Sequence, residues 1–66
     1  MDYSNSQIRD LIAEYVHSEK DRQILQRRLI DGITFERLAE EFEMSPKAIR
    51  IRIHKQEQIL FRHLPG

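Results

Sequence analysis

Two short amphipathic segments separated by a tight break, within residues 34 to 53, constrain the fold of this chain most strongly. Thr34 precedes the apolar positions of the first segment, and its hydroxyl can accept a free backbone N–H as an N-cap. The second segment opens on Ser45 and Pro46, a capping residue followed by one that suits a first turn needing no N–H donor. The stretch therefore predicts two helices joined by a turn at Glu43-Met44.

Three residues in this stretch, by their type and spacing, favour a helix-turn-helix over two unrelated helices. Ala39 falls where the helices would cross most closely, Met44 would fill the corner of the turn, and Ile49 follows on the inner face of the second helix. Glu43 departs from the common pattern, which often has Gly at this position. We expect the unit to span residues 34–63. The predicted buried stripe of its first helix is Phe35, Leu38, Ala39 and Phe42.

Two more helices are predicted before this unit. Residues 6 to 16 should form the first, capped by Ser4 or Ser6, because Ile8, Leu11, Ile12, Tyr15 and Val16 recur at helical spacing. Residues 18 to 21 resemble a capping box with Asp21 in the Glu position, and they would open a second helix through Ile24, Leu25, Arg28 and Leu29. Asp31-Gly32 should end that helix, since Gly can adopt the left-handed conformation of a C-cap. The last helix should run to about His63, with Leu64-Pro65-Gly66 ending the chain. The expected fold is one all-α, four-helix domain over residues 1–66.

Composition limits the classes of function. The 66 residues are 39% hydrophobic and 33% charged, which suits a compact helical domain with one small core. The chain has no cysteine, which excludes disulfides and thiolate metal sites. No apolar run approaches the roughly 18 residues of a membrane span, and no signal peptide is recognisable. We therefore expect a cytoplasmic protein without a membrane partner.

No set of residues indicates catalysis. The three histidines, His17, His54 and His63, are scattered over different helices, and only His54 with Glu57 has a spacing that could share a metal ion. No nucleophile with an adjacent base and no pair of carboxylates is placed for chemistry. The acidic run Glu40-Glu41-Glu43 is expected to be a solvated face. The sequence predicts no enzyme activity, no metal and no cofactor.

The distribution of charge is more informative than its sum, which is zero. Residues 1 to 45 carry ten acidic and six basic side chains, a balance of −4, whereas residues 46 to 66 have a balance of +4. Such an asymmetry lets one face attract phosphate while the rest of the molecule stays soluble. The alternative interpretation is an ordinary solvated helix whose charges happen to be basic.

A projection of the last helix at 100° per residue separates two faces. Arg and Lys can bond guanine edges or phosphates, and an aliphatic side chain can contact a thymine methyl, so a basic outward face fits a DNA groove. Ile51 could instead be an unremarkable exposed residue or a dimer contact, and Lys47 and Arg50 could simply be solvated. The core side is predicted to hold Ile49, Ile53, Leu60 and Leu64. The outward side is predicted to hold Lys47, Ile51, His54, Lys55, Gln58 and Arg62, with Arg50 at the border.

Several of these motifs together resemble the conserved region 4 of bacterial sigma-70-type sigma factors. The similarity covers roughly residues 19 to 64, and an acidic residue at the turn is also common in primary sigma factors. The spacing of Ile49 and Ile53 is closer to extracytoplasmic-function sigma factors and small sigma-like regulators. The residues that carry the resemblance are Asp21-Arg22-Gln23-Ile24-Leu25 with Arg28, Gly32-Ile33-Thr34-Phe35, Leu38-Ala39, Phe42-Glu43-Met44-Ser45 and Ile49-Arg50.

The resemblance implies a domain that reads promoter DNA of the −35 type with its last helix. In the family, region 4 also contacts the flap of the RNA polymerase β subunit. By matching position, Ser45 would contact phosphate. Arg37, Pro46 and Ile51 depart from the family pattern, and region 2 is not recognisable, so we do not expect a complete sigma factor. Together with the outward face, the resemblance makes the DNA-binding candidates Ser45, Lys47, Arg50, Ile51, His54 and Lys55.

Two hypotheses for function follow. The first is a small bacterial, phage or mobile-element protein that binds specific double-stranded DNA in transcription regulation. The second is a protein-interaction module that docks on RNA polymerase or on a sigma factor without reading DNA. We also expect a monomer or a weak homodimer. Candidates for a dimer seam are Ile59, Phe61 and Leu64, which could instead close the core against the first helix.

Overall fold

Four helices make up the part of the chain described by the computed structural model, residues 3–63. They are α1 (Asn5–Tyr15), α2 (Glu19–Leu29), α3 (Phe35–Glu41) and α4 (Pro46–Arg62). The predicted all-α, four-helix architecture is confirmed, and no strand occurs within the described range. The bounds differ little from the prediction. Helix α1 begins one residue earlier and ends one residue earlier than expected, and α4 ends one residue before His63.

Each helix begins after a Ser or Thr that accepts a backbone N–H, as the sequence predicted for α2, α3 and α4. For α1 the cap is Ser4, the first of the two candidates, and Gln7 completes a reciprocal capping box with it. The capping box predicted for α2 is only half formed. The hydroxyl of Ser18 accepts from the N–H of Asp21 at 3.4 Å, but the carboxylate of Asp21 binds α4 instead.

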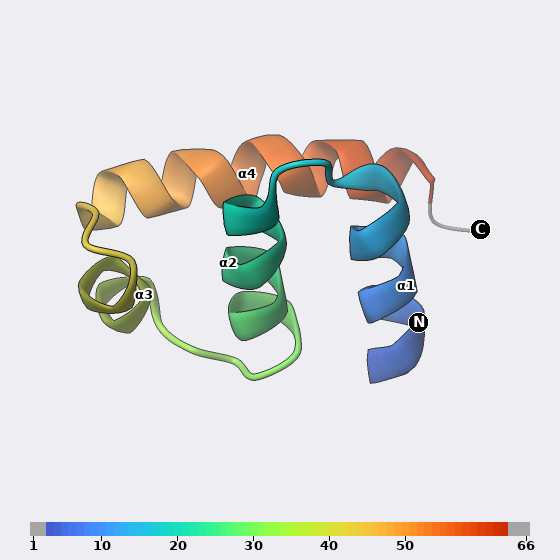
Figure 1. Cartoon of the computed structure of the whole chain (residues 1–66), viewed down its shortest axis with the longest axis horizontal. Coiled ribbons are helices and arrows are strands. Elements are labelled where there is room, and N and C mark those ends of the chain that lie inside the picture. The colour runs from blue at the N-terminus through green and yellow to red at the C-terminus, as the bar shows by residue number, and fades with distance from the viewer. Residues whose placement is uncertain (1–2, 64–66) are drawn as a thin grey trace.

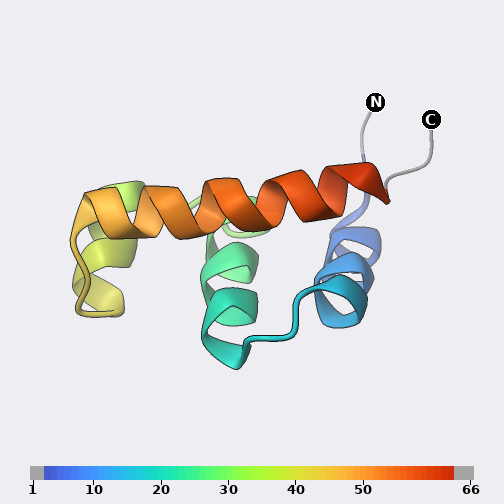
Figure 2. The ribbon, with the colours of Figure 1, turned by 90° about the horizontal axis from the view of Figure 1, so that it is seen from above.

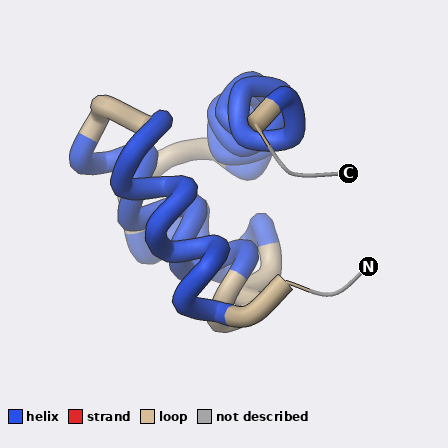
Figure 3. Tube along the Cα trace, turned by 90° about the vertical axis from the view of Figure 1, so that its right-hand side faces the viewer, coloured by secondary structure: helices blue, strands red, loops and turns tan. Residues whose placement is uncertain are grey.

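Helix α4 extends along the length of the molecule, and the other three helices lie against it in reverse order (Figure 1). Its N-terminal end lies beside α3, its middle beside α2 and its C-terminal end beside α1, an arrangement that is also visible from above (Figure 2). Helix α2 contacts all three other helices, whereas α1 and α3 do not contact each other. The domain is compact, measuring 33 × 19 × 18 Å, and the view along α4 shows the other helices on one side of it (Figure 3).

The core lies in the space between α4 and the other helices. The predicted burial of Ala39, Ile49, Ile53 and Leu60 is confirmed, whereas Phe35 and Phe42 are only half-buried. Leu64, also predicted for the core, lies outside the described residues. None of the helices within residues 3–63 combines the length and the apolar character needed to cross a bilayer. The buried apolar residues are Ile12, Val16, Ile24, Leu25, Leu38, Ala39, Ile49, Ile53 and Leu60.

A polar clamp joins α2 to α4. Asp21 is buried, with 8% of its surface exposed, and its carboxylate accepts hydrogen bonds from Arg52 at 2.7 Å and from Gln56 at 2.9 Å. Both carboxylate oxygens therefore have a partner, as a buried charge requires. At the C-terminal end of α4 the ring of His63 stacks on Tyr15 of α1, with ring centroids 3.8 Å apart. These contacts hold α4 in one orientation over α1 and α2.

Candidate nucleic-acid interface

The turn between α3 and α4 determines how α4 is presented. Glu43 has a φ of 55°, in the left-handed region that favours Gly, which explains why this position is often Gly in such turns. The N–H of Glu43 donates to the carbonyl of Glu40 at 3.4 Å, and the N–H of Met44 donates to that of Ala39 at 2.9 Å. The side chain of Met44 is half-buried against the core, as predicted, and Ala39 is only 6% exposed. The chain therefore reverses tightly and packs α4 on α3.

The first turn of α4 is open to an anion. The hydroxyl oxygen of Ser45 accepts from the N–H of Ala48 at 3.1 Å, so the hydroxyl hydrogen remains available to donate. No acidic residue lies in this first turn, and Lys47 adds a positive charge to the positive end of the helix dipole. The environment of Ser45 is consistent with a phosphate contact, which remains a prediction for this residue.

The outward face of α4 carries the predicted candidates. All six are exposed, and so are Gln58 and Arg62. The ion pairs of residues 3–63 involve Arg22, Arg27 and Arg52, and none of them uses Lys47, Arg50, Lys55 or Arg62. These four cations are therefore not neutralised by any acidic side chain in the described part of the chain. The exposed candidates are Ser45, Lys47, Arg50, Ile51, His54 and Lys55.

An aromatic ring extends the cationic surface beyond α4. The guanidinium carbon of Arg50 lies 5.2 Å from the centroid of the Phe35 ring, and that of Arg28 lies 4.3 Å from the same centroid. Arg28 also donates to the carbonyl of Ile33 at 3.0 Å. Such cation–π contacts hold a guanidinium in place while leaving N–H donors at its edge free. Phe35 thus brings a cation from the end of α2 beside one from α4.

Arg28 was not among the predicted site residues, which all lie on the last helix or at its N-cap. Its presence in the region 4-like motif, seven residues before Phe35, was the one signal that could have suggested it. The structure also corrects the charge argument. Arg52 contributed to the predicted basic surplus of residues 46 to 66, but its charge is paired with buried Asp21. The free cations of α4 are therefore fewer than the sequence suggested.

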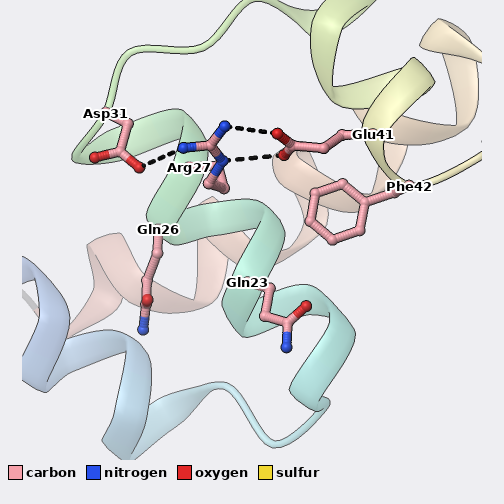
Figure 4. Close-up of a pocket in the computed structure, with 6 residues that line it drawn as sticks. All are labelled: Gln23, Gln26, Arg27, Asp31, Glu41 and Phe42. Carbon is pink, nitrogen blue, oxygen red and sulfur yellow. Dashed lines mark hydrogen bonds and ion pairs between the residues drawn. The ribbon is translucent and has the colours of Figure 1, made fainter.

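A second charged region lies between α2 and α3, in an open cleft of about 420 Å³ (Figure 4). Arg27 donates to both carboxylate oxygens of Glu41, at 2.6 and 3.0 Å, and to Asp31 at 3.1 Å. Glu41 is exposed, as predicted for the acidic run, and its carboxylate is in addition ion-paired with Arg27. The hydrogen bond from Arg27 holds the pKa of the Glu41 carboxyl below its ordinary value, and the two carboxylates raise the pKa of Arg27. Because Arg27 is engaged on both sides, this cleft offers no free cation.

The histidines do not form a metal site in the structure. His54 shares a hydrogen bond of 3.1 Å with Gln58 on the exposed face of α4, and His63 is stacked on Tyr15. Within residues 3–63, no three side chains of the His, Cys, Asp and Glu types come together in a way that could hold a metal ion. His54 and Gln58 instead form a polar edge beside the cations of α4, with hydrogen-bonding groups that a base edge can use.

Comparison with known proteins gives no relative: no protein-family model, no curated protein and no solved structure matches this chain. The resemblance to sigma region 4 consists of short motifs along residues 19 to 64.

Proposed function

We propose that this chain is a sigma region 4-like helix-turn-helix domain that binds specific double-stranded DNA in transcription regulation. Helix α3 would cross the DNA backbone and α4 would lie in the major groove. The observation that carries the proposal is the exposed face of α4, where Lys47, Arg50 and Lys55 have no ion-pair partner among residues 3–63. Within α4 itself the one acidic residue is Glu57, which is half-buried.

The free cations and the other polar groups would have different roles. Contacts of Lys and Arg with phosphates supply sequence-independent affinity, and they make that affinity fall steeply with salt concentration. Contacts with base edges supply specificity. Ser45 and Lys47 at the helix N-terminus fit phosphate positions, whereas Ile51, His54 and Lys55 lie further along the helix, where base edges would be reached.

The fold supports this use of α4 by restraining it. Phe35 at the start of α3 contacts the guanidinium of Arg50, and the clamp of Asp21 with Arg52 and Gln56 holds the opposite side of the helix. A restrained recognition surface loses less conformational entropy when it binds. Arg28, next to the same Phe35 ring, adds a cation that a neighbouring phosphate could reach.

The decisive experiment is fluorescence anisotropy with a labelled mixed-sequence duplex of about 20 base pairs at about 50 mM salt. Lys47→Glu and Arg50→Glu are each expected to weaken binding at least tenfold, because a lost contact costs about 1–3 kcal/mol and the reversed charge adds repulsion. Lys20→Glu, at an exposed position of α2, is the matched control, since it changes net charge equally. Circular dichroism of each variant would establish that it remains folded.

Wild-type affinity in both α4 variants would refute the DNA-binding proposal. An equal loss in Lys20→Glu would show that net charge alone, and not the face of α4, determines binding. An NMR titration with the same duplex supplies an independent map. The proposal expects the shifted amides to be those of residues 45–55.

One observation favours the second candidate function, docking on RNA polymerase or on a sigma factor without reading DNA. Phe61, in the last turn of α4, is 58% exposed and borders an apolar cleft of about 120 Å³. Exposed aromatic residues beside apolar clefts are common in protein-binding surfaces. In the DNA titration, shifts confined to α1–α3 would support this candidate. The residues that line the cleft are Tyr3, Ile8, Leu11, Leu29, Leu60 and Phe61.

The predicted homodimer seam falls at the same end of the molecule. Phe61 is exposed as expected, Ile59 is half-buried, and Leu64 lies outside the described residues. Sedimentation of the wild type and of Phe61→Glu, with and without DNA, would test the seam. A dimer that is lost in Phe61→Glu would support it, and a strictly monomeric wild type would exclude it.

A further inference from the structure

An apolar residue lies in the middle of the cationic face of α4. Ile51 is 59% exposed, and it belongs neither to the buried core nor to the half-buried apolar residues packed against it. Lys47 and Lys55 stand four residues before and four residues after it, so the three side chains form one row on the helix. Both lysines are exposed and lack an ion pair within residues 3–63. The row therefore has a positive charge at each end and an aliphatic centre.

This row restricts which groups on the base edges the centre of the helix can contact in a major groove. Base edges there present hydrogen-bond donors and acceptors, and one apolar group, the C5-methyl of a pyrimidine. An isoleucine pressed against a donor or acceptor would leave that group desolvated without a partner, which costs free energy. Two flanking lysines can meanwhile bond phosphates or guanine edges on either side.

We infer that Ile51 contacts the C5-methyl group of a thymine base, and that Lys47 and Lys55 contact the DNA on either side of that base. The inference rests on the proposed DNA-binding function and deepens it by naming one chemical feature of the target. The same methyl group occurs on 5-methylcytosine, so the experiment must distinguish the two sources. Burial of one methyl group corresponds to about a fourfold gain in affinity.

The test begins with duplexes selected by the wild-type protein from a random library. Each thymine in the selected sequence is then replaced by uracil, which removes only the methyl group. Uracil at one position is expected to weaken wild-type binding about fourfold, whereas Ile51→Ala should bind that duplex and its thymine form equally. Asp10→Ala, at an exposed position of α1, is the matched control and should keep the uracil penalty. Exposed Ile51 can be replaced by Ala without loss of core packing.

A further pair of duplexes distinguishes the sources of the methyl group. At the sensitive position, 5-methylcytosine paired with guanine is compared with unmodified cytosine and with thymine. Tighter binding to thymine than to 5-methylcytosine supports thymine as the target, and the reverse order overturns that part of the inference while retaining methyl recognition.

The failures of the two proposals can be told apart. If the wild type binds duplex DNA but is indifferent to uracil at every thymine, the inference fails and the DNA-binding proposal stands. The same holds if Ile51→Ala keeps the full uracil penalty. If duplex DNA is bound but selection yields no preferred sequence, the inference fails together with the sequence specificity of the proposed function, and DNA binding itself stands. If no duplex is bound at low salt, both proposals fail together.

Discussion

Replacement of Asp21 by Ala is expected to destabilise the domain by about 2–3 kcal/mol. The carboxylate is nearly buried and accepts two hydrogen bonds, from Arg52 at 2.7 Å and from Gln56 at 2.9 Å. Hydrogen bonds to a charged group contribute about 1.5–3 kcal/mol each, so the two bonds together would contribute more than the destabilisation expected here. Part of the loss is recovered, because the side chain of Arg52 is 42% exposed and can be rehydrated once its partner is removed.

Thermal and urea denaturation followed by circular dichroism would measure this loss. A domain of this size shifts its Tm by roughly 4–8 °C per kcal/mol, so a decrease of roughly 10–20 °C is expected. Asp10→Ala is the matched control, since Asp10 is an exposed aspartate of α1, and surface substitutions usually stay within about 0.5 kcal/mol. A double-mutant cycle with Arg52→Ala would isolate the coupling between the two charges.

Two results would contradict the role given to Asp21. One is a Tm of Asp21→Ala within about 3 °C of the wild type. The other is strict additivity of Asp21→Ala and Arg52→Ala, which would show that the two side chains do not stabilise each other. The first would mean that α4 is held on α2 by apolar packing alone.

Three further substitutions test other parts of the structure. Ala39→Leu should cost about 1–3 kcal/mol by overpacking the contact between α3 and α4, and an unchanged Tm would show that this contact is loose. Gly32→Val should cost roughly 1–2 kcal/mol. The cost comes from backbone strain alone, since Gly32 has a φ of 70° and no atom lies within 4 Å of an added Cβ. A stability equal to the wild type would contradict that backbone conformation. Glu41→Gln should flatten the acid limb of the stability–pH curve. Arg27 lowers the pKa of Glu41 in the folded state. The stability contributed by this ion pair is therefore complete above the ordinary pKa of 4.5 and is lost as the pH falls through the lowered pKa. Identical acid limbs in the wild type and in Glu41→Gln would exclude this linkage.

The helices themselves could be predicted closely because their signals are local. Thr34 and Ser45 accept N–H groups three residues further on, and the left-handed Gly32 follows the end of α2 as expected. Helical spacing also identified Ile49 and Ile53 as core residues. Such signals act over three or four residues, so tertiary packing need not be known to read them.

The candidate site was only partly predictable. Projection of the last helix correctly predicted that Lys47, Ile51 and His54 are exposed. It could not show that Arg52, on the same helix, is paired with Asp21, nor that Arg28 reaches the ring contacted by Arg50. Whether a cation is free or neutralised depends on which acidic residue packs beside it.

The sequence by itself determined the number of helices, their caps and the outward and inward faces of α4, because each depends on neighbours within one or two turns. The tertiary structure decided which charges pair. Arg27 meets Glu41 across 14 residues and Asp21 meets Arg52 across 31, and both pairs form only when α2 packs against α3 and α4. An isolated helix exposes all of its charged side chains to water, so no local pattern distinguishes a charge that will be buried in a clamp from one that remains free for a partner.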